Sequence, residues 1–170
     1  MNDEIIVWEM PDRTVCYATC AHSYKKPGET RTQWLLRAFN KTVKDNPQYA
    51  GAKRILNPVM PDRKPLVPGP DDHPVEHAFM GAWRHLGGGN IAIDMPKARA
   101  LKLTRIRAER DGRFPPLDAE WMKATGQKKS MEADAIEARR QHLRELPQTV
   151  DLEAIATPET LAAFDPDWEG

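Results

Sequence analysis

The chain has 170 residues, 40% of them apolar, with 25 basic and 25 acidic side chains and a mean hydropathy of −0.66. This length suits one domain, or a small domain with an appendage. The zero net charge excludes a general attraction to nucleic acid or anionic membranes, and no apolar run is long enough to span a bilayer.

Residues 1–94 predict a small α+β head. It opens with Glu4–Met10, a run rich in β-branched and aromatic residues. Pro11–Arg13 is typical of a turn, and Thr14–Cys20 reads as the returning strand, so we expect a β-hairpin.

A helix is predicted after Thr30, which is a suitable N-cap, and Pro47 prevents it from continuing. Lys53–Asn57 predicts a short third strand. The apolar stripe of the helix consists of Trp34, Leu35, Ala38, Phe39 and Val43.

Prolines crowd residues 58–74 and favour an extended loop that is mobile or is ordered by a partner. His73–Trp83 predicts a short helical turn, which Gly87–Gly89 breaks before a last strand at Asn90–Met95. We expect four aromatic side chains to form the core of the head: Trp34, Phe39, Phe79 and Trp83.

Residues 95–170 predict a helical arm with an acidic tail. Asp94 caps a first helix over Met95–Asp111, with Pro96 in its first turn, where the missing amide donor is harmless. The stretch Gly112–Pro116 is expected to interrupt it, and a second helical piece ends at Gly126.

A third helix is predicted over Met131–Glu145, capped by Ser130 and stopped by Pro147. Thr157 begins a short helix that runs through Phe164. The arm therefore reads as a helical hairpin whose first half is kinked.

Charge is segregated along this arm. Residues 95–150 carry 13 basic and 8 acidic side chains, whereas residues 151–170 carry none basic and six acidic. We expect this acidic segment to fold onto the basic helices of its own chain or of a neighbour. Trp168, which lies within it, is expected to be either frayed or docked on a partner.

The basic stretch raises the alternative of a small nucleic-acid-binding regulator. At 100° per residue its cations scatter around most of the helix, whereas a nucleic-acid helix more often gathers them on one face beside aromatic or amide groups. Nucleic acid is therefore not the favoured partner. The cations are Lys97, Arg99, Lys102, Arg105, Arg107, Arg110 and Arg113.

Catalytic and metal-binding patterns are weak. Cys16 and Cys20 on one strand would lie about 13 Å apart, too far for a disulfide. Cys16, Cys20 and His22 do not have the spacing of a standard zinc site, and neither does the pair His73 and His77. The sequence has no nucleophile elbow, phosphate loop or dinucleotide fingerprint, and the Asp118 and Glu120 carboxylates fall on a predicted helix surface. We expect no enzymatic activity and no metal or cofactor.

Several segments resemble small tail-region proteins of tailed bacteriophages. That family has an I-x-x-D-M strand before an arginine-rich helix, then P-L-L-x-x-L-D-x-x-Y/F-x-x-A, K-Q-x-L-R-D and A-x-T-P-E-E-L patterns. Its N-terminal half carries P-G-E-S-E-x-x-W-L-x-R and D-R-x-F-R-x-A-W. The similar segments here, in patches over Pro27–Trp168, are PGETRTQWLLRAF, HAFMGAW, NIAIDMPKARALKLTRIRAER, PPLDAEWMKA, ARRQHLREL and ATPETLAAFDPDW.

The resemblance implies a structural protein of the virion tail, made in the host cytoplasm, that docks onto other tail or fibre proteins or onto further copies of itself. The C-terminal hairpin is also similar to tail-fibre assembly proteins, so a chaperone for fibres is the alternative. The side chains expected to bind partners are Arg99, Arg107, Arg110 and Trp168. We expect their substitution to weaken assembly and to leave the thermal midpoint nearly unchanged.

Overall fold

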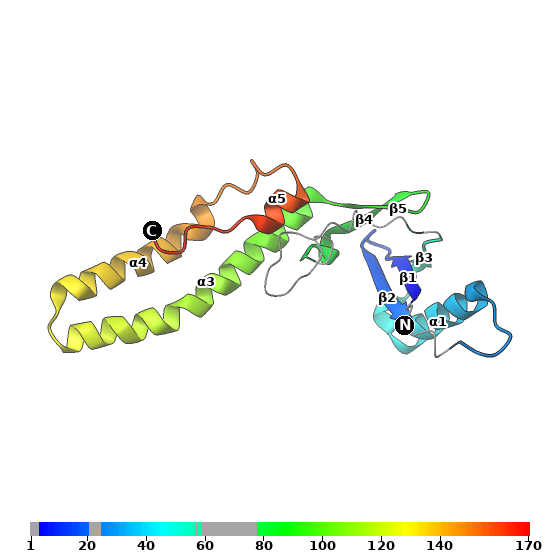
Figure 1. Cartoon of the computed structure of the whole chain (residues 1–170), viewed down its shortest axis with the longest axis horizontal. Helices are drawn as coiled ribbons and strands as arrows, with labels where there is room; N and C mark the ends of the chain where they lie inside the picture. Colours follow the sequence, from blue (N-terminus) through cyan, green and yellow to red (C-terminus); the bar gives the residue numbers. More distant parts are fainter. Residues whose placement is uncertain (1–3, 21–24, 57, 59–77) are drawn as a thin grey trace. The chain divides into compact units, whose positions relative to one another are not determined.

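The computed structural model of the chain describes residues 4–20, 25–56, 58 and 78–170. Contacts divide the chain into two compact units, Met1–Asp94 and Met95–Gly170. The first contains the strands and one long helix, and the second is helical (Figure 1). The predicted α+β class is therefore confirmed. The proline-rich loop predicted at 58–74 lies outside the described residues, apart from Pro58.

The first unit is built on a three-stranded antiparallel sheet of order β2-β1-β3. The hairpin of β1 (Glu4–Glu9) and β2 (Val15–Cys20) places Val7 opposite Tyr17. β3 (Lys53–Arg54) pairs with the other edge of β1. β-branched and aromatic residues suit this sheet because both of its faces are covered.

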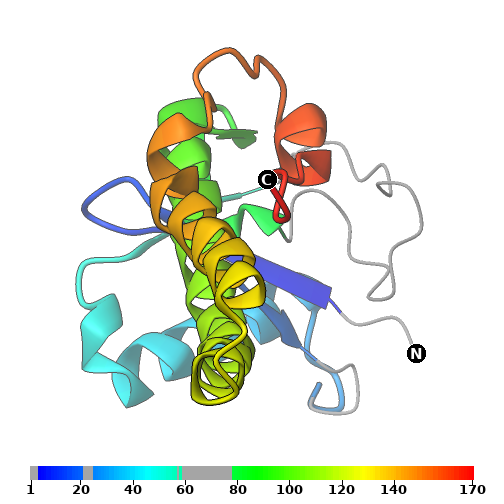
Figure 2. The same cartoon turned by 90° about the vertical axis from the view of Figure 1, so that its left-hand side faces the viewer.

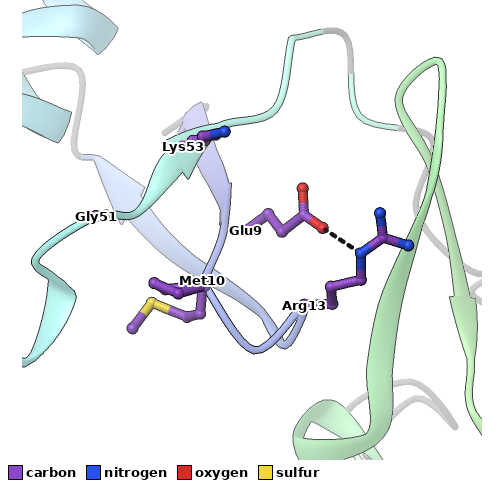
Figure 3. Close-up of a pocket in the computed structure, with 6 residues that line it drawn as sticks. Glu9, Met10, Arg13, Gly51 and Lys53 are labelled. Atoms are coloured by element: carbon purple, nitrogen blue, oxygen red, sulfur yellow. Dashed lines mark ion pairs between the residues drawn. The ribbon is translucent and has the colours of Figure 1, made fainter.

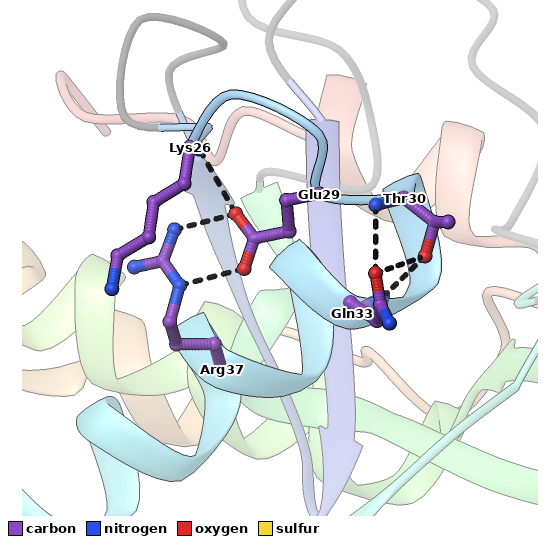
Figure 4. Close-up of polar contacts among 5 residues, drawn as sticks. All are labelled: Lys26, Glu29, Thr30, Gln33 and Arg37. Carbon is purple, nitrogen blue, oxygen red and sulfur yellow. Dashed lines mark hydrogen bonds and ion pairs between the residues drawn. The ribbon is translucent and has the colours of Figure 1, made fainter.

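Helix α1 (Arg31–Asp45) covers one face of the sheet. It begins with a capping box in which the Thr30 hydroxyl accepts the Gln33 amide and the Gln33 side chain accepts the Thr30 amide (Figure 4). The predicted N-cap is thus confirmed. A 3-10 turn, η2 (Pro47–Tyr49), follows the helix. The apolar cluster on this face is formed by Ile6, Trp8, Trp34, Leu35 and Phe39.

A β-ribbon covers the opposite face. The 3-10 turn η3 (Met80–Ala82) lies within the helical turn predicted at His73–Trp83, of which residues 73–77 lie outside the described part of the chain. The prediction missed β4 (Trp83–Gly87), which follows η3 and pairs with β5 (Asn90–Ile93). Gly88 and Gly89 have φ of 58° and 85°, as a two-residue hairpin turn of type I′ requires. The glycine run is therefore a hairpin turn, and the strand before it alternates buried and exposed side chains.

The two faces of β1 follow the alternation of a strand. Ile6 and Trp8 point to the α1 side, and Val7 joins the ribbon side. Tyr17 packs on Trp83 there, with 5.4 Å between ring centroids. The second cluster consists of Val7, Val15, Ile55, Trp83 and Ile91. All four expected core residues are buried: Trp34, Phe39, Phe79 and Trp83.

The second unit begins with α3 (Met95–Gly126), a single helix of 32 residues. The predicted interruption is wrong, because Pro115 and Pro116 lie inside the helix. Each interior proline removes a backbone hydrogen bond and costs about 3 kcal/mol. The rings of both prolines point to solvent, and the next residue, Leu117, is buried against α4, so packing offsets the local cost.

Helix α4 (Ser130–Thr149) continues past Pro147, which is buried in its last turn, so the predicted stop at this residue is also wrong. Lys129, not Ser130, occupies the N-cap position. The short α5 (Pro158–Ala163) begins at Thr157, whose hydroxyl accepts the Thr160 amide.

A tight turn makes α3 and α4 antiparallel. The Lys129 amide bonds the Ala124 carbonyl and the Lys128 amide bonds the Thr125 carbonyl, both at 3.0 Å. This is a Schellman motif, with Lys128 at φ 58° in the position that glycine usually takes. Figure 2 shows α4 lying along α3. Their seam contains Leu117, Ala124, Ile136, Leu143 and Leu146.

Within the described ranges, no helix combines the length and the apolar character needed to cross a bilayer.

Candidate protein-interaction site

The first part of α3 uses its cations within its own chain. Arg99 donates to Glu153 Oε2 at 2.9 Å and to the Ile155 carbonyl at 2.8 Å, and its side chain is only 17% exposed. Lys102 Nζ donates to the Ala162 carbonyl at 3.2 Å, and burial lowers its pKa. These two cations bind residues that follow α4, so they stabilise the fold of the second unit.

The later cations of α3 differ in their availability. Arg110 pairs with Asp111 at 2.7 Å, and Arg113 pairs with Glu109 at the same distance. Arg107 is exposed and makes no ion pair with any residue that the structure describes. Of the three arginines expected to bind partners, Arg107 therefore has the freest side chain.

Trp168 docks on its own hairpin. The guanidinium carbon of Arg113 lies 4.2 Å from the centroid of the indole ring, a cation–π arrangement. The indole Nε1 donates to Asp165 Oδ1 at 2.8 Å, and the ring packs against the seam of the two helices. Of the alternatives that the sequence left open, the structure shows the segment folded onto its own chain.

Further polar contacts fix the end of this segment to α4. Glu169 pairs with Arg139 at 2.5 Å, and the His142 ring lies 2.7 Å from the Asp167 carbonyl oxygen. The Asp167 carboxylate accepts the amides of Glu169 and Gly170, which lower its pKa. We call residues 151–170 the acidic segment. The receiving face comprises the side chains that hold it: Arg99, Lys102, Arg113, Arg139 and His142.

A further ion-pair cluster lies between α3 and α4. Arg140 pairs with Asp118 at 2.9 Å and with Glu137, and its guanidinium stacks over Trp121 at 5.3 Å. Arg144 also pairs with Glu137. These bonds lower the pKa of Glu137, with the Arg144 hydrogen bond as the largest cause. Asp118 therefore contributes an interhelical ion pair.

The first unit has a polar pocket of about 180 Å³ beside the β1–β2 turn (Figure 3). Its carboxylate, Glu9, lies 3.9 Å from Arg13 and 3.0 Å from the His85 ring of β4. Glu9 thus links β1 of the sheet to β4 of the ribbon. The lining residues are Glu9, Met10, Pro11, Arg13, Gly51 and Lys53.

A larger, more open hollow of about 630 Å³ lies beside β2. It contains Cys16, a half-buried thiol whose pKa is raised by burial and, to a smaller extent, by the Asp12 carboxylate. A raised pKa keeps this thiol protonated and makes it a poor nucleophile. The hollow is lined by Trp8, Thr14, Val15, Cys16, Tyr17, Ala18, Tyr49, Met80 and Gly81.

The zinc hypothesis meets no support among the described side chains, where no three His, Cys, Asp or Glu groups gather to hold an ion. The side chain of Cys20 and the residues His22, His73 and His77 lie outside that part of the chain.

The sequence singled out Arg99, Arg107, Arg110 and Trp168 as partner-binding residues, and the structure shows Arg99 and Trp168 in contacts within the chain. The sequence-based prediction missed the part played by α4. Arg139 and His142 are three residues apart, so they share one helix face. That spacing, beside a segment rich in acids, was the available signal. Only the antiparallel pairing of α3 and α4 brings both residues near Trp168.

No protein-family model, curated protein or solved structure matches this chain.

Proposed function

We propose that this chain is a structural component of a bacteriophage tail that works by docking onto other tail proteins and catalyses no reaction. The resemblance of its segments to small phage tail-region proteins supports this assignment. The exposed charged side chains of the α3–α4 hairpin favour docking onto another protein.

The exposed side chains of the hairpin suit a protein partner. Arg107 projects from α3, and Met122 and Met131, near the α3–α4 turn, are 68% and 87% exposed. Methionine adapts its shape to a partner surface, and an exposed cation such as Arg107 adds charge complementarity at another part of α3. This combination favours protein recognition.

The nucleic-acid alternative is less well supported. Arg99 and Lys102 hold backbone carbonyls, and Arg110 and Arg113 pair with carboxylates of α3. Cations engaged in this way have less to gain from phosphates. A gel shift at low salt tests the point, because phosphate contacts would appear there first.

The test of the tail assignment is mass spectrometry of purified particles of the phage that encodes the chain. We expect the protein in intact particles and in isolated tails. Its presence only in infected-cell lysate, together with soluble fibre, would assign it to fibre assembly instead. Absence from both fractions would remove the tail assignment.

A paired variant tests the docking surface. Replacing Arg107 by Ala is expected to reduce assembled tails in a complementation experiment. Lys44→Ala, at an exposed cation on α1, is the control and is expected to assemble normally. Equal behaviour of the two variants would argue against this face of α3.

A further inference from the structure

The acidic segment is attached to the hairpin as a separate docked peptide. Its apolar side chains Leu152 and Leu161 are 7% and 0% exposed, and Trp168 packs on the seam. Its polar contacts reach α3 from the start to the middle of that helix, and α4 at and just beyond its middle. All of them join the segment to the receiving face of the hairpin: Arg99 to Glu153, Arg99 to Ile155, Lys102 to Ala162, Arg113 to Trp168, Arg139 to Glu169 and His142 to Asp167.

The two surfaces are complementary in charge. The acidic segment has six acidic and no basic side chains, and the polar side chains that hold it are four cations and a histidine. Because the segment has no cation, it cannot satisfy its carboxylates with charges of its own. A receiving face of this chemistry selects an acidic peptide that carries an aromatic side chain.

The connection between α4 and α5, residues 150–157, has no helix and contains a turn. After Thr149 the chain forms no helix until Pro158, and its internal bonds are turns centred on Asp151 and Leu152. An extended linker of this length reaches about 25 Å. Because Leu152 is buried and Arg99 holds Glu153 and Ile155, the exchange releases this connection together with the rest of the acidic segment.

We propose that the acidic segment of one copy docks on the receiving face of a second copy of this chain. The contacts are the same within one chain and between two, so the exchange requires no new surface. Which arrangement prevails depends on the protein concentration relative to the effective concentration of the tethered segment, which is on the order of 1 mM for a short linker. Copies gathered in an assembly reach that range. This inference does not depend on the phage assignment.

Sedimentation equilibrium of the full chain gives the first measurement. Between roughly 10 μM and 1 mM we expect the average mass to rise from monomer towards dimer or longer chains. Because Trp168→Ala weakens the contact within one chain and between two chains equally, we expect it to leave this association nearly unchanged. A monomer throughout this range overturns the proposal.

A cross-link shows which surfaces meet. A Cβ built on Gly170 lies 2.9 Å from His142 Cγ, so cysteines at both positions are within disulfide reach. We would mix the His142→Cys and Gly170→Cys variants at high concentration, oxidise them, and identify disulfide-linked peptides by mass spectrometry. Since each new cysteine is on a different chain, exchange should raise the yield of the bond between them above that of random collisions.

The expected product is the mixed disulfide, in clear excess over the two symmetric disulfides that random collisions give. The double variant, with both cysteines in one chain, verifies that the positions can be joined. If the double variant closes and the mixture gives only collision products, the segment stays on its own chain and the proposal is wrong. A dimer without this bond would place the interface elsewhere and overturn the proposal equally.

Discussion

The guanidinium of Arg113 lies over the indole of Trp168, with 4.2 Å between the guanidinium carbon and the ring centroid. This contact joins the middle of α3 to the acidic segment, two regions that are far apart in sequence. Through this contact Trp168, which lies in a segment without an apolar core, packs as part of the helical unit.

Replacing Trp168 by Ala is expected to lower the free energy of unfolding by about 1–3 kcal/mol, because a partly buried ring and its cation–π contact are lost. Trp168→Phe keeps an aromatic face for Arg113 and should lose less. Urea denaturation followed by circular dichroism measures both variants. Equal losses would mean that the Nε1 bond to Asp165, rather than the ring, carries the stability.

Arg99 and Arg107 should behave differently although they lie on the same helix. Arg99→Ala leaves the Ile155 carbonyl and Glu153 without their donor and is expected to cost about 1–2 kcal/mol. Arg107→Ala removes an exposed side chain and should change stability by less than about 0.5 kcal/mol. Thermal denaturation distinguishes them, and matching midpoints would show that the Arg99 contacts contribute nothing.

Trp83 is expected to be essential to the first unit. It is 1% exposed and packs in the cluster between sheet and ribbon, so Trp83→Ala should cost about 3–5 kcal/mol. The matched control on the same strand is Leu86→Ala. Leu86 is 66% exposed, and its replacement should cost less than about 0.5 kcal/mol. Chemical denaturation tests the pair, and a small loss at Trp83 would contradict the packing described above.

Glu29 should make stability depend on acid pH. Its two hydrogen bonds from Arg37, followed by the amide of Lys26, lower its pKa to about 2 (Figure 4). The unfolded carboxyl, with a pKa of about 4.3, binds a proton more readily, so stabilisation is full above that pH and is lost as the pH falls towards 2.

The measurement for Glu29 compares the wild type with Glu29→Gln in denaturant at neutral pH and at a pH near 2. The variant should be less stable at neutral pH, and the difference should shrink in acid. A difference that stays constant with pH would assign the effect to the shape of the side chain rather than to its charge.

Lys128 holds a backbone conformation that suits glycine. With φ at 58°, a side chain at this position costs roughly 1 kcal/mol, so Lys128→Gly should stabilise the hairpin by up to that amount. Lys129→Gly, at the next position, has no such strain to relieve and should destabilise. Thermal midpoints of the two variants compare them directly. A loss at both positions would show that the flexibility added to the unfolded chain dominates.

Local patterns in the sequence were sufficient for much of the fold. The β-branched run of Glu4–Glu9, the capping residue Thr30 and the stripe of α1 each predicted their element correctly, because backbone geometry and side-chain periodicity act over a few residues. The acidic composition of residues 151–170 likewise indicated a basic surface as its binding site.

Tertiary structure decided what neighbouring residues could not. Pro115 and Pro116 favour a break, yet α3 continues because the burial of Leu117 against α4 offsets the lost hydrogen bonds. β4 forms because Gly88 and Gly89 let it pair with β5, which buries Trp83 against the sheet. The docking of Trp168 on its own chain depends on the antiparallel pairing of α3 and α4. This pairing brings Arg139 and His142 of α4 into contact with the acidic segment. Such long-range contacts outweigh local preference because they remove apolar surface from water.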